Sequence, residues 1–168
     1  MIGNIRDKIL DLYINNALVC DALLVFVIWI LNSNYSIVTY TIAKKEENIS
    51  ILSDTIAASI SLAGFILAAL TIIAAIKSNL ANKTPQDARN PLELFFSPTN
   101  YRTIMKVFQG SIKELTCCCI VAYTTWIPIE NISNILLFKI LVSIIFIISI
   151  SLTRSLMVLY KIVNMKDY

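Results

Sequence analysis

The chain has 168 residues, of which 57 % are hydrophobic and 15 % charged, and its mean hydropathy is +0.74. These values exclude an ordinary soluble domain and indicate one small membrane bundle. The 14 Lys and Arg outnumber the 11 Asp and Glu, but most of the cations flank predicted helix ends and do not form one basic surface. We therefore expect no direct binding of nucleic acid.

The sequence lacks the residue types that most enzymes and metal sites need. It contains no histidine, which is the commonest general base and the usual zinc ligand. The four cysteines do not replace it, because Cys117, Cys118 and Cys119 point about 100° apart around a helix and no C-x-x-C spacing occurs. Together with Cys20 they are interpreted as small apolar residues, or alternatively as sites of reversible acylation. We expect no enzyme, no metal and no cofactor.

Four apolar stretches come close to or exceed the ~20 residues that a helix needs to cross the hydrocarbon core of a membrane. They cover residues 17–42, 49–76, 104–127 and 135–160, with a cytosolic loop over residues 77–103. Backbone amides cannot stay unpaired in lipid, so these stretches must be helices. The predicted fold is all-α: an integral membrane four-helix bundle in a single transmembrane domain, with a cytosolic extension of the third span.

An amphipathic helix is predicted before the first span, because apolar residues recur there at steps of three and four. These residues are Ile2, Ile5, Ile9 and Leu12. A signal peptide is the competing interpretation, but no small-x-small cleavage site follows, so we expect the segment to be retained. A first span that starts at Ala17 leaves Asn32-Ser33-Asn34 near the outer boundary, whereas a start at Ala22 would place this triplet deeper.

The second span should form an antiparallel hairpin with the first, because the loop over residues 44–48 is short. Side chains four residues apart lie on one face of a helix, and small ones allow another helix to approach closely. The small residues that recur in this way are Ser53, Ala57, Ser61, Gly64 and Ala68. This small-residue strip predicts either packing within the chain or self-association into a homo-oligomer.

The middle loop carries an apolar patch that is unusual for a segment expected in water. The patch comprises Leu92, Leu94, Phe95 and Phe96. Exposed apolar area of this kind is normally covered. We therefore expect the patch to pack back on the bundle, to insert in the membrane interface, or to dock a soluble cytosolic protein partner.

The third helix is predicted to begin in the cytosol, where Ser97 and Pro98 are typical of an N-cap and a first helical residue. An apolar stripe then faces the bundle, formed by Tyr101, Ile104, Met105, Phe108, Ile112 and Leu115. The opposite face is polar, with Arg102, Lys106, Gln109 and Lys113. Such a helix would measure ~45 Å and exceed the bilayer core. Its cationic face could meet the soluble partner.

Ionisable residues within or beside the spans are the sharpest functional signals, because an unpaired charge in a membrane costs several kcal/mol. Asp21 and Arg154 fall at similar predicted depths, as do Asp54 and Lys139 near the other side. We expect snorkelling or structural pairing, or alternatively the lining of a hydrated pathway. The spacing suggests no intramembrane pair of carboxylates.

Lys and Arg distribute unevenly between the two sides that these spans define. Eleven of the 14 fall on the side of both termini and the middle loop, and three fall on the other. The positive-inside rule therefore predicts an N-in, C-in, multi-pass protein of the inner (cytoplasmic) cell membrane. The three outer cations are Lys44, Lys45 and Lys139.

The layout resembles the small four-helix membrane subunit of the Kiwa anti-phage system. The chain length, the short outer links and the basic segment from Lys77 to Lys113, which carries Leu92-Glu93-Leu94-Phe95-Phe96, support this resemblance. It implies a homo-oligomeric membrane sensor or scaffold in bacterial anti-phage defence whose cytosolic face recruits a soluble DNA-binding partner. Pore-forming effectors of bacterial abortive-infection systems have a similar layout, so a homo-oligomeric pore or ion channel is the alternative.

Overall fold

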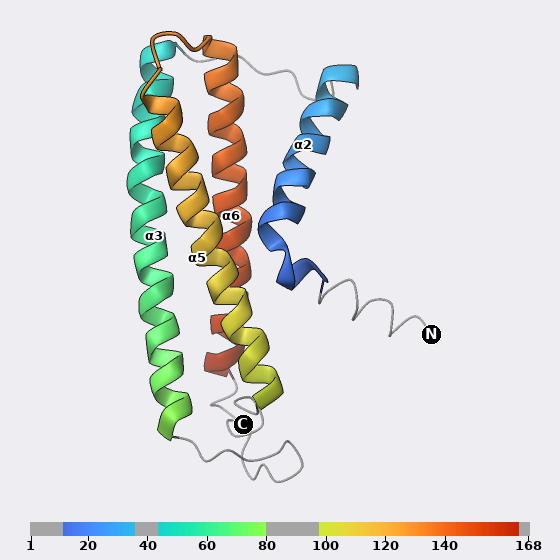
Figure 1. Cartoon of the computed structure of the whole chain (residues 1–168), viewed down its shortest axis with the longest axis vertical. Helices are drawn as coiled ribbons and strands as arrows, with labels where there is room; N and C mark the ends of the chain where they lie inside the picture. The colour runs from blue at the N-terminus through green and yellow to red at the C-terminus, as the bar shows by residue number, and fades with distance from the viewer. Residues whose placement is uncertain (1–11, 36–43, 80–97, 165–168) are drawn as a thin grey trace.

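The computed structural model describes residues 12–35, 44–79 and 98–164, where the chain consists of helices joined by turns and has no strand. The long helices are α2 (Ala17–Tyr35), α3 (Lys45–Asn79), α5 (Pro98–Trp126) and α6 (Asn134–Asn164). Successive helices run in opposite directions (Figure 1). The all-α prediction is confirmed within these ranges. Most of the predicted N-terminal amphipathic helix, the last part of the first predicted span and the loop over residues 80–97 lie outside the described residues.

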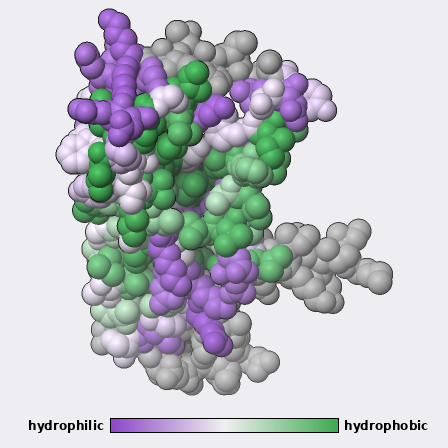
Figure 2. Space-filling model, turned by 45° about the horizontal axis from the view of Figure 1, so that its top comes forward, coloured by the Kyte–Doolittle hydropathy of each residue, from purple (hydrophilic) through white to green (hydrophobic). Residues whose placement is uncertain are grey.

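Three of these helices, α2, α3 and α6, are long and apolar enough to cross a membrane. This supports a membrane protein, as the hydropathy predicted. α5 does not reach the same apolar length, because the first half of α5 carries charged side chains on one face. On the face that Figure 2 shows, hydrophilic side chains gather toward both ends of the molecule and hydrophobic side chains lie between them.

α3, α5 and α6 pack around one apolar core. Each contributes apolar side chains at steps of three and four residues, which fall on one face of a helix. Leu52 and Ile66 of α3, Phe108 and Leu115 of α5, and Leu137 of α6 have no exposed surface.

Hydrogen bonds align the three core helices at the end where α3 and α6 begin and α5 ends, which we call the Lys45 end. Lys45 Nζ donates to the carbonyl oxygen of Glu130 at 3.0 Å, and Asn48 Nδ2 donates to Asn134 Oδ1 at 2.8 Å. The opposite end, where α5 begins and α3 and α6 end, is called the Pro98 end.

The predicted loop over residues 44–48 is wrong for all but its first residue, because Lys45–Asn48 form the first turn of α3. Glu46 and Glu47 place negative charge in this turn, where it interacts favourably with the helix dipole. Asn48 is buried and bonded to α6, which ties the turn to the bundle.

The predicted hairpin between the first two spans does not form as a packed pair. α2 and α3 run in opposite directions, but α2 packs mainly against α6 and α5 and stands apart from α3 (Figure 1). The apolar stripe of α3 already faces α5 and α6, whereas α2 carries a carboxylate, Asp21, that pairs with Arg154 of α6. The pairing of Asp21 with Arg154 therefore places α2 beside α6, and the length of the loop between α2 and α3 does not decide this.

α2 is shorter than each of the three core helices by more than two turns. The 19 residues of α2 span about 28 Å, and the 35 residues of α3 span about 52 Å. α5 and α6, with 29 and 31 residues, span about 44 and 46 Å. Because Asp21 near the start of α2 meets Arg154, α6 continues about 15 Å beyond this contact toward the Pro98 end. The three core helices thus form a helical extension beyond the start of α2.

The predicted amphipathic character of α5 is confirmed. Ile104, Phe108 and Leu115 are buried in the core, and the polar face is exposed along its length. The exposed side chains on that face are Arg102, Lys106, Gln109 and Lys113. α5 begins at Pro98, as the proline predicted.

Candidate functional site

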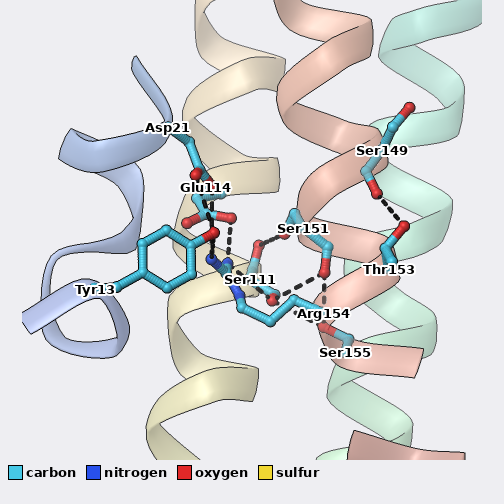
Figure 3. Close-up of polar contacts among 9 residues, drawn as sticks. All are labelled: Tyr13, Asp21, Ser111, Glu114, Ser149, Ser151, Thr153, Arg154 and Ser155. Atoms are coloured by element: carbon cyan, nitrogen blue, oxygen red, sulfur yellow. Dashed lines mark hydrogen bonds and ion pairs between the residues drawn. The ribbon is translucent and has the colours of Figure 1, made fainter. Parts of the chain in front are cut away.

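Three ionisable side chains from three helices converge in the interior between α2, α5 and α6 (Figure 3). Arg154 of α6 extends its guanidinium toward Glu114 of α5 and Asp21 of α2. The Nη2 atom lies 2.5 Å from Glu114 Oε2, and the Nη1 atom lies 3.5 Å from Asp21 Oδ2. Glu114 is fully buried, Asp21 is 2 % exposed, and the Arg154 side chain is 12 % exposed. We call these three residues the ionic cluster.

Tyr13, just before α2, closes the ionic cluster on one side. Its hydroxyl donates to Asp21 Oδ1 at 3.0 Å and accepts from Arg154 Nη1 at 3.2 Å. The guanidinium also lies 5.5 Å from the centre of the tyrosine ring, within cation–π range. Burial raises the pKa of Tyr13 above its ordinary value of 10.0, so the hydroxyl keeps its proton and remains a donor.

Three buried serines surround the other side of the ionic cluster, where α5 and α6 approach closely. Arg154 Nη2 donates to Ser111 Oγ at 3.3 Å, and Ser155 Oγ donates to the same oxygen at 2.8 Å. Ser111 and Ser151 each donate to the other's carbonyl oxygen, at 3.3 and 3.4 Å. Small hydroxyl residues permit this close helix contact and satisfy each other's polar atoms.

The ionic cluster contains two carboxylates and one guanidinium, so it carries excess negative charge when both acids are ionised. Asp21 Oδ2, Glu114 Oε1 and Arg154 Nε are buried without a hydrogen-bond partner in the described part of the chain. Buried charge without full compensation is costly. The contacts of Arg154 with both carboxylates supply the charge compensation that the described part of the chain offers.

The sequence pattern predicts two members of the ionic cluster and not the third. Asp21 and Arg154 are predicted at one depth, and the structure brings them into contact. The prediction that the spans contain no pair of carboxylates is wrong, because Glu114 joins Asp21 around Arg154. The missed signal was helical spacing: Val107, Ser111 and Glu114 continue the buried face at steps of four and three.

The predicted pair of Asp54 and Lys139 does not form. Asp54 is exposed on α3. Lys139 Nζ instead lies 5.4 Å from the ring centre of Trp29, whose Nε1 donates to Ser143 Oγ at 2.8 Å. Lys139 therefore joins α6 to α2 through an aromatic ring, near the Lys45 end.

The small-residue strip of α3 does not pack within the chain. All five of its residues are exposed, and a Cβ atom built on Gly64 would meet no atom within 4 Å. Packing within the chain was one of the two interpretations of this strip, and it is wrong. The strip lies on the outer face of α3, opposite the buried side chains that contact α5 and α6.

The predicted partner-binding residues divide into two groups. Leu92, Leu94, Phe95 and Phe96 lie outside the described residues. Arg102, Lys106 and Lys113 are exposed on α5. Lys106 Nζ also donates to Asn15 Oδ1 at 2.8 Å, which connects α5 to the segment before α2. The cationic face thus runs from the helical extension to the level where α2 begins.

The cysteines are unpaired thiols, and Cys118 is buried. In the described part of the chain, no group of three or more Cys, Asp or Glu side chains could hold a metal ion. No protein-family model, curated protein or solved structure matches this chain.

Proposed function

We propose that this chain is the membrane-embedded sensor or scaffold subunit of a bacterial anti-phage defence complex and that it recruits a soluble cytosolic partner. The carrying observation is the row of exposed cations on α5, which runs from Arg102, on the helical extension, to Lys113, at the level of the first turns of α2. The link to phage defence comes from the resemblance in layout. The proposed role is binding and signalling, without catalysis.

The proposed membrane placement rests on helix length and charge. α2, at about 28 Å, matches the ~30 Å hydrocarbon core, whereas the core helices exceed that core by about 14 to 22 Å. The proposal places this excess in the cytosol, at the Pro98 end, and makes the apolar second half of α5 the fourth span. The positive-inside rule supports this orientation. The described cations toward the Pro98 end are Lys77, Arg102, Lys106, Lys113, Arg154 and Lys161, and only Lys44, Lys45 and Lys139 lie toward the Lys45 end.

The partner in this proposal presents an acidic surface to α5. Arg102 and Lys113 are exposed on one face of a helix whose other face is fixed in the core. A rigid row of cations steers and orients an oppositely charged partner. Under the proposed orientation, a soluble protein would meet this row on the cytosolic side.

The test is recovery of the partner from cells that express the tagged chain. Arg102→Glu with Lys113→Glu should weaken recovery about tenfold or more, because each lost charge-assisted contact contributes ~1.5 kcal/mol or more. Membrane insertion and particle size should stay unchanged. Lys77→Glu is the matched control, since Lys77 lies near the same end on α3. Equal recovery of the same partner with the double variant would contradict the scaffold role.

A pore is the second candidate, and the outer face of α3 favours it. Beside the small-residue strip, this face exposes Ser50, Asp54 and Thr71. A ring of such faces around an oligomer axis would form a polar lining. Dye leakage from loaded liposomes that Asp54→Asn abolishes, with no partner recovered from cells, would favour the pore over the scaffold.

A further inference from the structure

A groove of about 620 Å³ opens between α2 on one side and α5 and α6 on the other. Its walls are almost entirely apolar and include Ala22 of α2, Val121 of α5 and Ile144 of α6. The sole charged side chain among its lining residues is Lys139. We call it the α2 groove. It is separate from the ionic cluster, which lies nearer to the Pro98 end.

The α2 groove extends from the first turn of α2 to within about 9 Å of the end of this helix. Along α2 it reaches from Leu18 to Trp29, which is about 16 Å of helix. This is roughly half of the ~30 Å hydrocarbon core. The groove also opens on the outside of the bundle, at the level of the helices proposed to cross the membrane. An extended hydrocarbon chain therefore fits both its chemistry and its length.

Lys139 gives the α2 groove a cationic end. Trp29 lies beneath the ammonium group, and the hydrogen bond from the indole to Ser143 fixes this ring. No carboxylate in the described part of the chain forms an ion pair with Lys139. The segment 36–43, which follows α2, contains no Asp or Glu in its sequence. The ammonium group is therefore able to bind an anion. Phosphate oxygens are strong hydrogen-bond acceptors for such a cation.

We propose that the α2 groove binds one acyl chain of a phospholipid with an anionic headgroup, whose phosphate is held by Lys139. The ring of Trp29, about 9 Å before the end of α2, contacts the lipid where its acyl chain meets its headgroup, which suits an amphipathic aromatic side chain. The bound lipid fills the space between α2 and the core helices, and so it tethers α2. This inference rests on the membrane insertion set out under the proposed function.

The test is native mass spectrometry of the protein after transfer from vesicles of phosphatidylglycerol or phosphatidylcholine. The wild-type chain should retain phosphatidylglycerol in preference to phosphatidylcholine. Lys139→Gln should lower the affinity for phosphatidylglycerol about tenfold or more, whereas Lys139→Arg should keep the preference. Lys44→Gln is the matched control, because Lys44 is exposed near the same end and does not line the groove.

A second variant tests the acyl-chain part of the site. Ala22 is exposed on the groove wall, so Ala22→Phe should fill the groove and reduce binding of both lipids without removing any cation. The proposal is overturned if phosphatidylglycerol shows no preference, if Lys139→Gln retains it as well as the wild type, or if Lys44→Gln weakens it equally. If the chain inserts and recruits its partner but fails these lipid tests, the lipid site is contradicted and the proposed function is not. A chain that does not insert would remove the proposed function as well.

Discussion

At the residue scale, Arg154 is the most connected polar side chain in the interior. It bridges two carboxylates, a tyrosine hydroxyl and a serine hydroxyl on two other helices and on the segment before α2. Because Asp21 and Glu114 are almost fully buried, the guanidinium compensates charges that water cannot reach. Arg154 therefore sets the position of α2 against α5 and α6.

Replacing Arg154 with methionine should destabilise the fold strongly. The change leaves two buried carboxylates without their cation, and breaking a buried ion pair from one side costs about 3–5 kcal/mol. Unfolding in detergent, followed by circular dichroism, measures the loss. Adding Asp21→Asn and Glu114→Gln to this variant should recover much of the stability, because the remaining polar groups are then neutral. An unchanged melting curve for Arg154→Met would show that the ionic cluster does not stabilise the bundle.

At the element scale, the two faces of α3 have different structural roles. Its apolar face builds the core, and its small-residue strip remains uncovered within one chain. In lipid, the hydrophobic effect does not drive helices together, because lipid tails are as apolar as the side chains. Small residues favour association there because they let two helices pack closely. A second copy of this chain is the occupant expected on the strip.

A bulky residue in the strip should disrupt the oligomer and leave the protomer intact. Gly64→Leu meets no atom of its own chain near the new Cβ, and leucine raises helix propensity by less than ~1 kcal/mol over glycine. Gly110→Leu on α5 is the matched control, since its Cβ also meets nothing within 4 Å. Light scattering in detergent should show a smaller particle for Gly64→Leu only. The same mass for both variants would mean that the strip is not an oligomer seam.

The elements differ in how well the sequence predicted them. The start of α5, its apolar stripe and its exposed cations followed from spacing and from Pro98, because these signals are local. The neighbour of α2 and the burial of Glu114 depend on which helices meet, which no single-helix pattern contains. Glu114 sits next to the polar Lys113 in sequence, and only its step of three from Ser111 marks the buried side. The four-residue spacing predicted the small-residue strip of α3, but it did not show that the strip faces away from α5 and α6.

At the scale of the whole molecule, the chain combines a short helix, three long helices and an uneven charge distribution. The length of α2 matches one bilayer core. The helical extension contains the exposed Arg102, and the exposed Lys106 and Lys113 follow on α5 at the level where α2 begins. The scaffold role requires this extension to face the cytosol. The orientation of the bundle is therefore the central claim on which partner recruitment depends.

Cysteine accessibility tests this claim most directly. In a chain whose four native cysteines are replaced, single cysteines are placed at Lys83, in the middle loop, and at Glu46, in the first turn of α3. A membrane-impermeant maleimide added to intact cells should label the cysteine at 46 and should reach the one at 83 only after lysis. Labelling of both positions from the same side of the membrane would contradict the proposed topology and, with it, the scaffold function.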